Sequence, residues 1–181
     1  MIWLARHGET AANAEGRVQG RLDPPLNERG REQARALARE AEGLGLRTLY
    51  SSQLARARET ADTVGGRVGL EPVVDERLAE SNRGSWEGRL LREIEREDPD
   101  AWHAWQRAGS GFRFPGGGES LEEHVARVDA ALADVAAGEL PALVVCHGGT
   151  VRCALVARGG RSLDEFTRIA VPNASLVKVE A

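Results

Sequence analysis

The stretch Leu4-Ala5-Arg6-His7-Gly8-Glu9-Thr10 guides the interpretation of the whole chain. The apolar residues 2–5 predict a short buried strand, which then ends abruptly in a basic residue, a histidine and a glycine. In open α/β sheets, ligands bind beyond the carboxyl ends of the strands. Glycine lets the backbone approach a ligand closely, and backbone N–H groups in such a turn can face an anion. These residues therefore predict a ligand site at the end of the first strand.

The composition is that of an ordinary globular protein. The chain has 181 residues, 41% apolar and 29% charged, which predicts one domain spanning residues 1–181. No apolar run approaches the roughly 20 residues of a membrane span, and the start lacks a signal-peptide pattern. The net charge of -4 argues against general nucleic-acid binding. Because there is no such apolar run, we expect no membrane partner. Cys146 and Cys153 form no disulfide framework, so we expect a cytoplasmic protein.

Strand and helix patterns alternate along the chain. They predict an α/β fold, a three-layer α/β/α sandwich with a mainly parallel sheet and an antiparallel edge strand. Asn27 is the expected N-cap of a helix whose buried stripe would be Ala34, Leu37, Ala38 and Ala41. The expected strands are 2–5, 47–51, 72–74, 142–146 and 175–179. The expected helices are 27–42, 54–64 (closed by Gly65-Gly66), two within 90–107, one from Ser120 up to Gly138, and 148–156.

Two of these strands end in the same pattern. Residues 4–8 and 144–148 each run from an apolar strand into His-Gly and then into a helix. If both strands are parallel and central, His7 and His147 meet at one edge of the sheet. A third strand is followed by Arg56 and Arg58, which lie two positions apart on a helix, so that one would face the sheet edge and the other solvent. Arginine offers phosphate oxygens a planar, bidentate set of donors.

Four motifs occur in a fixed order and cover most of the chain. They are Arg6-His7-Gly8-Glu9-Thr10 with Asn13, residues 51–61, Leu78-Ala79-Glu80 with residues 84–88, and His147-Gly148-Gly149. Smaller matches at Gln19-Gly20 and 115–120 lie between them. Together these motifs resemble the histidine phosphatase (phosphoglycerate mutase-like) superfamily, and within it the phosphatase branch.

The resemblance implies a metal-independent phosphatase without a cofactor. His7 would attack phosphorus in line and become a phosphohistidine, and Glu80 would protonate the leaving oxygen and then deprotonate water. The substrate would be a small phosphorylated metabolite, with broad specificity or an α-ribazole-phosphate-like ester among the open options. The residues expected around the phosphoryl oxygens are Arg6, Gly8, Asn13, Gln19, Arg56, His147 and Gly148.

Three alternatives remain at this stage. Residues 146–152 fit C-x-x-G-x-x-R, which would make Cys146 the thiolate nucleophile of a cysteine-dependent phosphatase. A phosphoglycerate mutase is the alternative within the family. The family resemblance implies that such mutases are longer, with a segment inserted after the Glu80 motif, and carry Asn at the position of Gly149. A non-catalytic phosphate-binding module is the third alternative, and the presence of both His7 and Glu80 argues against it.

Several residues depart from the expected pattern or fall outside it. Gln53 stands where the family usually has Asp, and Arg83 stands where it often has an aromatic residue, so both should affect the pocket rim. Specificity is expected to depend on residues 84–118. His103 and His124 lie in helical, charged surroundings and are predicted to be surface residues. No sequence motif indicates a metal site.

Overall fold

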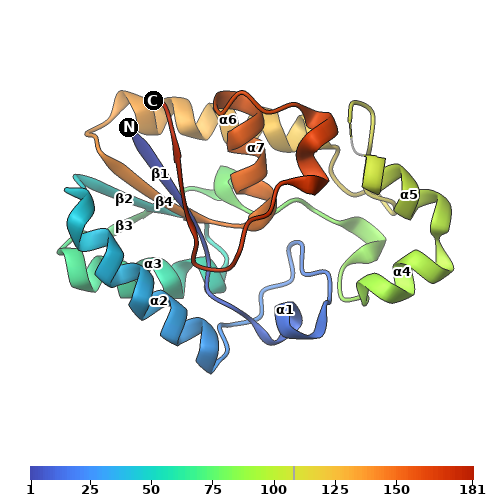
Figure 1. Ribbon diagram of the computed structural model, residues 1–181, viewed down its shortest axis with the longest axis horizontal. Coiled ribbons are helices and arrows are strands. Elements are labelled where there is room, and N and C mark those ends of the chain that lie inside the picture. The colour runs from blue at the N-terminus through green and yellow to red at the C-terminus, as the bar shows by residue number, and fades with distance from the viewer. Residues whose placement is uncertain (108) are drawn as a thin grey trace.

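The structure, a computed structural model, describes residues 1–107 and 109–181, in which a five-stranded sheet lies between helices (Figure 1). The strands lie in the order β3-β2-β4-β1-β5, and all pairs are parallel except β5 with β1. This confirms the predicted sheet and its antiparallel edge strand. The bounds are β1 (Ile2–Arg6), β2 (Thr48–Ser51), β3 (Pro72–Val74), β4 (Ala142–Cys146) and β5 (Leu176–Val179).

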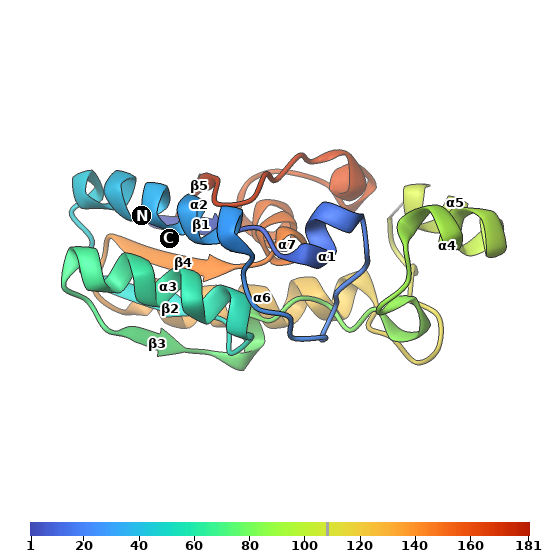
Figure 2. The ribbon, with the colours of Figure 1, turned by 90° about the horizontal axis from the view of Figure 1, so that it is seen from below.

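Helices cover both faces of the sheet. α2 (Glu28–Ala41) and α3 (Ala55–Val68) lie on one face, and α6 (Leu121–Ala137) and α7 (Gly148–Arg158) lie on the other (Figures 1 and 2). Three short helices lie beyond the carboxyl ends of the parallel strands: α1 (Ala11–Glu15), α4 (Leu91–Glu97) and α5 (Pro99–Arg107). None of the helices in the described ranges combines the length and apolarity needed to cross a membrane.

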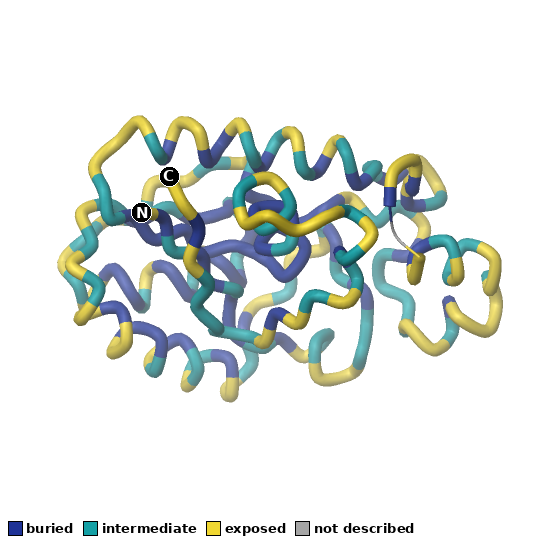
Figure 3. Tube along the Cα trace, turned by 45° about the horizontal axis from the view of Figure 1, so that its top comes forward, coloured by how far each residue is buried: buried dark blue, intermediate teal, exposed yellow. Residues whose placement is uncertain are grey.

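Successive strand residues face two separate cores, as a period of two requires. In β1, Ile2 and Leu4 pack with α6 and α7, whereas Ala5 packs with α2 and α3. All five residues of β4 are buried, which confirms a strand covered on both faces. Figure 3 shows the buried strands at the centre and exposed residues along the outer sides of the helices. The central position of β1 and β4 fixes their carboxyl ends at one place in the molecule.

The helix ends follow the expected signals with one clear exception. Asn27 caps α2 by accepting a hydrogen bond from the Gly30 N–H, and Ser120 forms a capping box with Glu123. The predicted end of α3 at Gly65-Gly66 is wrong, because the helix continues to Val68 and ends at Gly69, whose φ is 74°. A Cβ at Gly65 would lie 2.3 Å from the Leu70 carbonyl oxygen, so this glycine serves close packing rather than termination.

His124 is buried with no exposed surface, so its predicted place at the surface is wrong. It lies on α6 three residues after Leu121 and four before Val128, and therefore shares the buried stripe of that helix. Its Nε2 atom is 3.4 Å from the Thr150 hydroxyl on α7. His103 is exposed, as predicted.

An aromatic cluster anchors the segment between the Glu80 loop and α6. Trp86 is 1% exposed and its ring lies 5.5 Å from that of Phe114, centroid to centroid. Trp105 of α5 joins the same cluster, 5.1 Å from Phe114 and 5.8 Å from Phe166. Trp86, Trp105 and Phe114 therefore pack this segment onto the core, and Leu91 is its one described residue that lines the cavity beyond the strand ends.

The turn after β1 packs against the first turn of α2 without room for a side chain. A Cβ at Gly8 would lie 2.3 Å from the Gly30 carbonyl oxygen, and one at Gly30 would lie 2.0 Å from that of Glu9. We expect Gly30→Ala to lower the free energy of unfolding by about 1–3 kcal/mol, because two backbone segments must separate.

The matched control is Gly66→Ala within α3, where a Cβ would meet nothing within 4 Å. We expect it to raise the free energy of unfolding by about 0.5–1 kcal/mol, since alanine restricts the unfolded chain. Urea denaturation followed by circular dichroism measures both values. Equal effects of the two substitutions would contradict the tight contact at Gly30.

Candidate active site

The carboxyl ends of β1 and β4 place two histidines side by side. Arg6 pairs with Cys146 in the parallel register, so that the residues that follow, His7 and His147, lie at the same level. The centroids of their imidazole rings are 5.1 Å apart, and both side chains are buried. The sequence prediction that the two His-Gly turns meet at one sheet edge is therefore confirmed.

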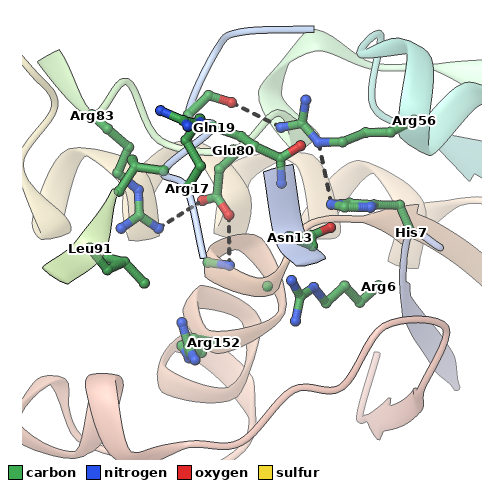
Figure 4. Close-up of a pocket in the computed structure, with 14 residues that line it drawn as sticks. Arg6, His7, Asn13, Arg17, Gln19, Arg56, Glu80, Arg83, Leu91 and Arg152 are labelled. Carbon is green, nitrogen blue, oxygen red and sulfur yellow. Dashed lines mark hydrogen bonds and ion pairs between the residues drawn. The ribbon is translucent and has the colours of Figure 1, made fainter. Parts of the chain in front are cut away.

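A cavity of about 190 Å³ opens above these turns (Figure 4). Among the residues predicted for the site, Arg6, His7, Asn13, Gln19, Arg56, Glu80 and Gly148 line it. His147 and Gly8 do not line it. His147 is fully buried beside His7, and Gly8 packs toward α2 and α3. The other lining residues are Arg17, Val18, Gly20, Arg83, Leu91, Gly149 and Arg152.

The orientation of His7 is set by a hydrogen bond from its Nδ1 atom, 2.7 Å from the Gly8 carbonyl oxygen. Because a carbonyl oxygen only accepts, Nδ1 carries the proton, and Nε2 keeps its lone pair. That lone pair accepts a hydrogen bond from Arg56 Nε at 3.3 Å. Burial lowers the pKa of His7 to about 3, and the neighbouring charges of Arg56 and Arg6 act in the same direction. The imidazole is therefore neutral at physiological pH.

Two arginines flank His7, of which Arg56 is buried and Arg6 is half-buried. Arg56 lies in the first turn of α3 and is 1% exposed, whereas Arg58 is exposed, as the helical spacing predicted. The Arg56 guanidinium donates to the Leu22 and Gly20 carbonyl oxygens at 2.7 and 2.9 Å, which holds it beside the cavity. Arg6 donates from Nη1 to the Val171 carbonyl oxygen at 2.6 Å. Its buried Nε has no hydrogen-bond partner among the described residues.

His147 lies at the N-terminus of α7 with its Nε2 atom 2.9 Å from the Ser52 hydroxyl. Its buried Nδ1 atom has no partner within the described part of the chain. Burial lowers the pKa of His147 well below its ordinary value, and the charge of Arg56 adds to this effect. The ring is neutral, and a proton on Nδ1 is possible only when Ser52 donates its hydroxyl hydrogen to Nε2.

Glu80 faces the cavity from the loop after β3. Its Oε2 accepts the Gly149 N–H at 3.0 Å, its Oε1 accepts the Ser81 N–H at 2.9 Å, and Arg83 Nη2 lies 3.5 Å from Oε1. Burial raises the pKa of this carboxyl group, but the Arg83 charge and the Ser81 N–H outweigh burial and bring the pKa well below the usual value. Glu80 is therefore ionised when no phosphate is bound.

Arg127 of α6 fixes the backbone that carries Glu80. Its guanidinium donates to the carbonyl oxygens of Arg77 and Ala79 at 2.6 and 2.7 Å, and to that of Glu80 at 3.2 Å. The same group forms an ion pair with Glu119 at 2.6 Å. Sequence reasoning missed Arg127 because its partners are backbone carbonyls some 50 residues away. No local pattern indicates such a contact.

Three further arginines line the cavity and were missing from the predicted site. Arg83 was expected only to alter the rim, and Arg152 entered the sequence argument only through the C-x-x-G-x-x-R pattern. Arg17, the third, lies just before the predicted Gln19. The available signal was compositional, since the basic residues of this chain are nearly all arginine, with Lys178 the only lysine.

The position of Cys146 argues against the thiolate alternative. Its side chain is fully buried in the core beneath α6 and α7 and does not line the cavity. Burial raises the pKa of the Cys146 thiol above its ordinary value, which is the opposite of activation. Gly148 and Gly149 of the same motif line the cavity instead.

Comparison with known proteins agrees with this geometry. The profile of the histidine phosphatase superfamily (branch 1) matches residues 2–181. Phosphoglycerate mutase-like protein 4 of Arabidopsis thaliana is 39% identical over 156 residues, which are 83% of this chain and 67% of the relative. A probable phosphoglycerate mutase of Shigella boydii is 35% identical over 182 residues, covering 99% of this chain and 84% of the relative.

Solved structures show the same fold. The mycobacterial glucosyl-3-phosphoglycerate phosphatase in complex with VO3 has a TM-score of 0.87 at 32% identity, covering 97% of this chain and 88% of that one. Bacillus stearothermophilus YhfR also has a TM-score of 0.87 at 32% identity, covering 99% and 91%. From the family match along nearly its whole length, this chain belongs to the histidine phosphatase superfamily, branch 1.

Proposed function

We propose that the protein is a phosphomonoesterase that forms a phosphohistidine at His7 while hydrolysing a small phosphorylated metabolite. One observation carries the proposal: a neutral His7 has its Nε2 lone pair at a cavity lined by the guanidinium groups of Arg6 and Arg56. Imidazole is a competent nucleophile when unprotonated, and phosphoryl transfer depends on stabilising the three equatorial oxygens. The cavity supplies both requirements.

In the first step, the Arg56 Nε–H moves from His7 Nε2 to a phosphoryl oxygen, and the freed Nε2 lone pair attacks phosphorus while the bond to the leaving oxygen breaks. Arg56, the unpartnered Nε of Arg6 and the Gly148 N–H at the start of α7 are the proposed donors to the equatorial oxygens. His147 supports this set through a proton on Nδ1, which requires Ser52 to donate to Nε2. Its ring lies 5.1 Å from that of His7, so its Nδ1 proton is proposed to reach an oxygen of a phosphoryl group held at His7.

Asn13 and Gln19 are proposed to complete the donor set through their amide NH2 groups. The Oδ1 atom of Asn13 already accepts from the Thr10 N–H at 3.1 Å and from Asn173 at 3.3 Å. The Oε1 atom of Gln19 lies 2.9 Å from the Thr10 hydroxyl. Because both amide oxygens are engaged on the protein side, the NH2 donors remain for an anion.

Glu80 is proposed to transfer the protons. It protonates the leaving oxygen as the first bond breaks. It then takes a proton from water, which attacks the phosphohistidine, breaks the P–N bond and releases phosphate with neutral His7. Since Glu80 is ionised in the free protein, the proton must arrive with a substrate monoanion, or the phosphate dianion must raise the pKa of Glu80 as it binds.

The contact between Glu80 and Gly149 favours hydrolysis over mutase chemistry. A Cβ at position 149 would lie 2.1 Å from Glu80 Oε1, so the Asn expected in mutases would displace the carboxylate. Residues 89–114 also connect the Glu80 loop to the 115–120 loop without a long insertion. We therefore propose water, rather than a second phosphate acceptor, as the group that receives the phosphoryl group.

Substitution of His7 tests the covalent intermediate directly. Brief incubation with a ³²P-labelled phosphate ester, followed by quenching, should trap an acid-labile, base-stable adduct on the natural protein. We expect His7→Ala to lose this adduct and to lower kcat by about a thousandfold or more. His103→Ala, at an exposed histidine, is the control and should label normally. Label retained in His7→Ala would exclude His7 as the nucleophile.

The acid role of Glu80 is tested by varying the leaving group. We expect Glu80→Gln to lower kcat for alkyl phosphates by about 10²–10⁴-fold, because their leaving oxygens need a proton. The loss should be much smaller for p-nitrophenyl phosphate, whose leaving group departs unprotonated. Glu76→Gln, at an exposed residue of the same loop, should change neither rate. A uniform loss across leaving groups would contradict proton donation by Glu80.

The depressed pKa of His7 predicts an unusual pH profile. Its neutral, nucleophilic form is present above about pH 3, so protonation of His7 should not reduce kcat/KM between about pH 4.5 and 6. Phosphate esters lose their second proton near about pH 6, and ionised Glu80 then has no proton to transfer. For an alkyl phosphate, kcat/KM should therefore fall above about pH 6. An acidic limb centred near the ordinary histidine pKa would contradict this assignment.

A further inference from the structure

We propose that the site is adapted to phosphate esters whose leaving group carries a second anionic group, bound by Arg83 and Arg152 on the side of the cavity away from His7. This inference rests on the proposed phosphatase function and narrows its substrate class. The shared chemistry is that of a carboxylate or a second phosphate, both of which accept bidentate hydrogen bonds from guanidinium groups.

The charges around the cavity exceed what one phosphoryl group needs. Five arginines and one carboxylate line it in the described part of the chain: Arg6, Arg17, Arg56, Arg83, Arg152 and Glu80. Arg6 and Arg56 flank His7 and are assigned to the phosphoryl dianion. Arg17 has its own ion pair with Glu15 at 3.1 Å. This leaves Arg152 without a described carboxylate partner and Arg83 paired only with Glu80, and both lie across the cavity from His7 in Figure 4.

Packing against two aromatic rings holds Arg83 in place. Its guanidinium carbon lies 4.5 Å from the Phe114 ring centroid and 5.1 Å from that of Trp105. The side chain is 13% exposed, and its buried Nε has no hydrogen-bond partner among the described residues. Its only described carboxylate partner is Glu80, at 3.5 Å. Such preorganisation suits a group that must bind an anion at a fixed place.

Arg152 lies on α7, five residues after His147, and faces the same space. Its Nε donates to the Ile169 carbonyl oxygen at 2.9 Å, which fixes the side chain, and its guanidinium carbon is 5.9 Å from the Phe166 ring centroid. No ion pair joins it to a carboxylate within residues 1–107 and 109–181. Burial lowers the pKa of Arg152, and the charge of Arg83 lowers it further, as expected for two cations that share one cavity.

The second anion would also enable the acid role of Glu80. When Glu80 is protonated to donate to the leaving oxygen, Arg83 loses the negative charge that faces it at 3.5 Å. An anionic group on the leaving group restores a counter-charge to Arg83. Glu80 lies between the His7 side and the Arg83 side of the cavity (Figure 4), which is where the leaving oxygen of such an ester would lie. Binding of the second anion and proton donation therefore support one another.

Discrimination follows from the cost of leaving these cations unpaired. A neutral leaving group would enter the cavity and partly desolvate Arg83 and Arg152 without supplying an anion to their free N–H groups. A site that binds a charged group discriminates strongly against an analogue without that group. An apolar pocket discriminates less strongly between ligands that differ only in shape. The cavity of about 190 Å³ suits a short carbon chain that joins the two anions.

A matched substrate pair tests the proposal. Glycerol 3-phosphate and 3-phosphoglycerate differ only by a hydroxymethyl group in place of a carboxylate. We expect kcat/KM to be about tenfold or more higher for 3-phosphoglycerate, and Arg152→Gln to reduce that ratio about tenfold, toward unity. Arg152→Lys, which keeps the charge but loses the bidentate geometry, should retain part of the preference. Arg92→Gln, at an exposed arginine, should leave the ratio unchanged.

The ratio cancels any effect of the variants on the shared phosphoryl chemistry. The same comparison between propane-1,3-diol bisphosphate and its monophosphate identifies which of the two anions the subsite prefers. A ratio near unity in the natural protein, with hydrolysis and His7 labelling intact, would overturn the second-anion subsite and leave the phosphatase function standing.

Failure to hydrolyse any ester, including p-nitrophenyl phosphate, would instead overturn the proposed function. Isothermal titration with the same two ligands then decides the subsite without turnover. Tighter binding of 3-phosphoglycerate that is lost in Arg152→Gln would support the subsite, and equal binding of both ligands would overturn it.

Discussion

The parallel pairing of β1 with β4 is the constraint on which the rest of the molecule depends. Both strands are central and buried on both faces, so their register cannot slip without moving apolar side chains out of two cores. That register places two His-Gly turns at one level, with the rings of His7 and His147 5.1 Å apart. The backbone then fits closely around them, because Gly8 packs on Gly30 and Gly149 packs on Glu80. The site is thus built into the strand ends themselves.

Burial and local contacts together set the charge of each group in the cavity. It keeps His7 and His147 neutral and brings the pKa of Arg56 down to about 10, while interactions with Arg83 and backbone N–H groups keep Glu80 ionised. The desolvated guanidinium groups are satisfied mainly by carbonyl oxygens, which orient them without neutralising them. The cavity therefore has a net positive charge, which an anionic ligand would neutralise.

The sequence was sufficient for features that depend on neighbouring residues. Continuous apolar runs located the two central strands, Asn27 and Ser120 located two helix starts, and the spacing of Arg56 and Arg58 separated a buried from an exposed arginine. It failed where packing between distant segments decides the outcome. Gly65 lies inside a helix, where the close Leu70 backbone leaves no room for a Cβ. His124 is buried because its face of α6 packs against α7. Arg127 was invisible for the same reason, since its partners are carbonyl oxygens of another loop.

The two sides of the cavity are formed by different kinds of structure. We relate the side with His7 to the proposed phosphoryl transfer, and the side with Arg83 to the proposed choice of leaving group. The side that holds His7, Arg6, Arg56 and the Gly148 N–H is formed by strand ends and the first turns of α3 and α7, which the sheet register fixes. The side that holds Glu80 and Arg83 is formed by a loop that depends on Arg127 and on the Trp86 aromatic cluster. Under the proposed mechanism, changes in that loop would alter which leaving group is accepted without moving His7, because rigid elements position the reacting atoms and loops vary more freely. Arg152, on α7 but aimed at the loop side, links the two halves.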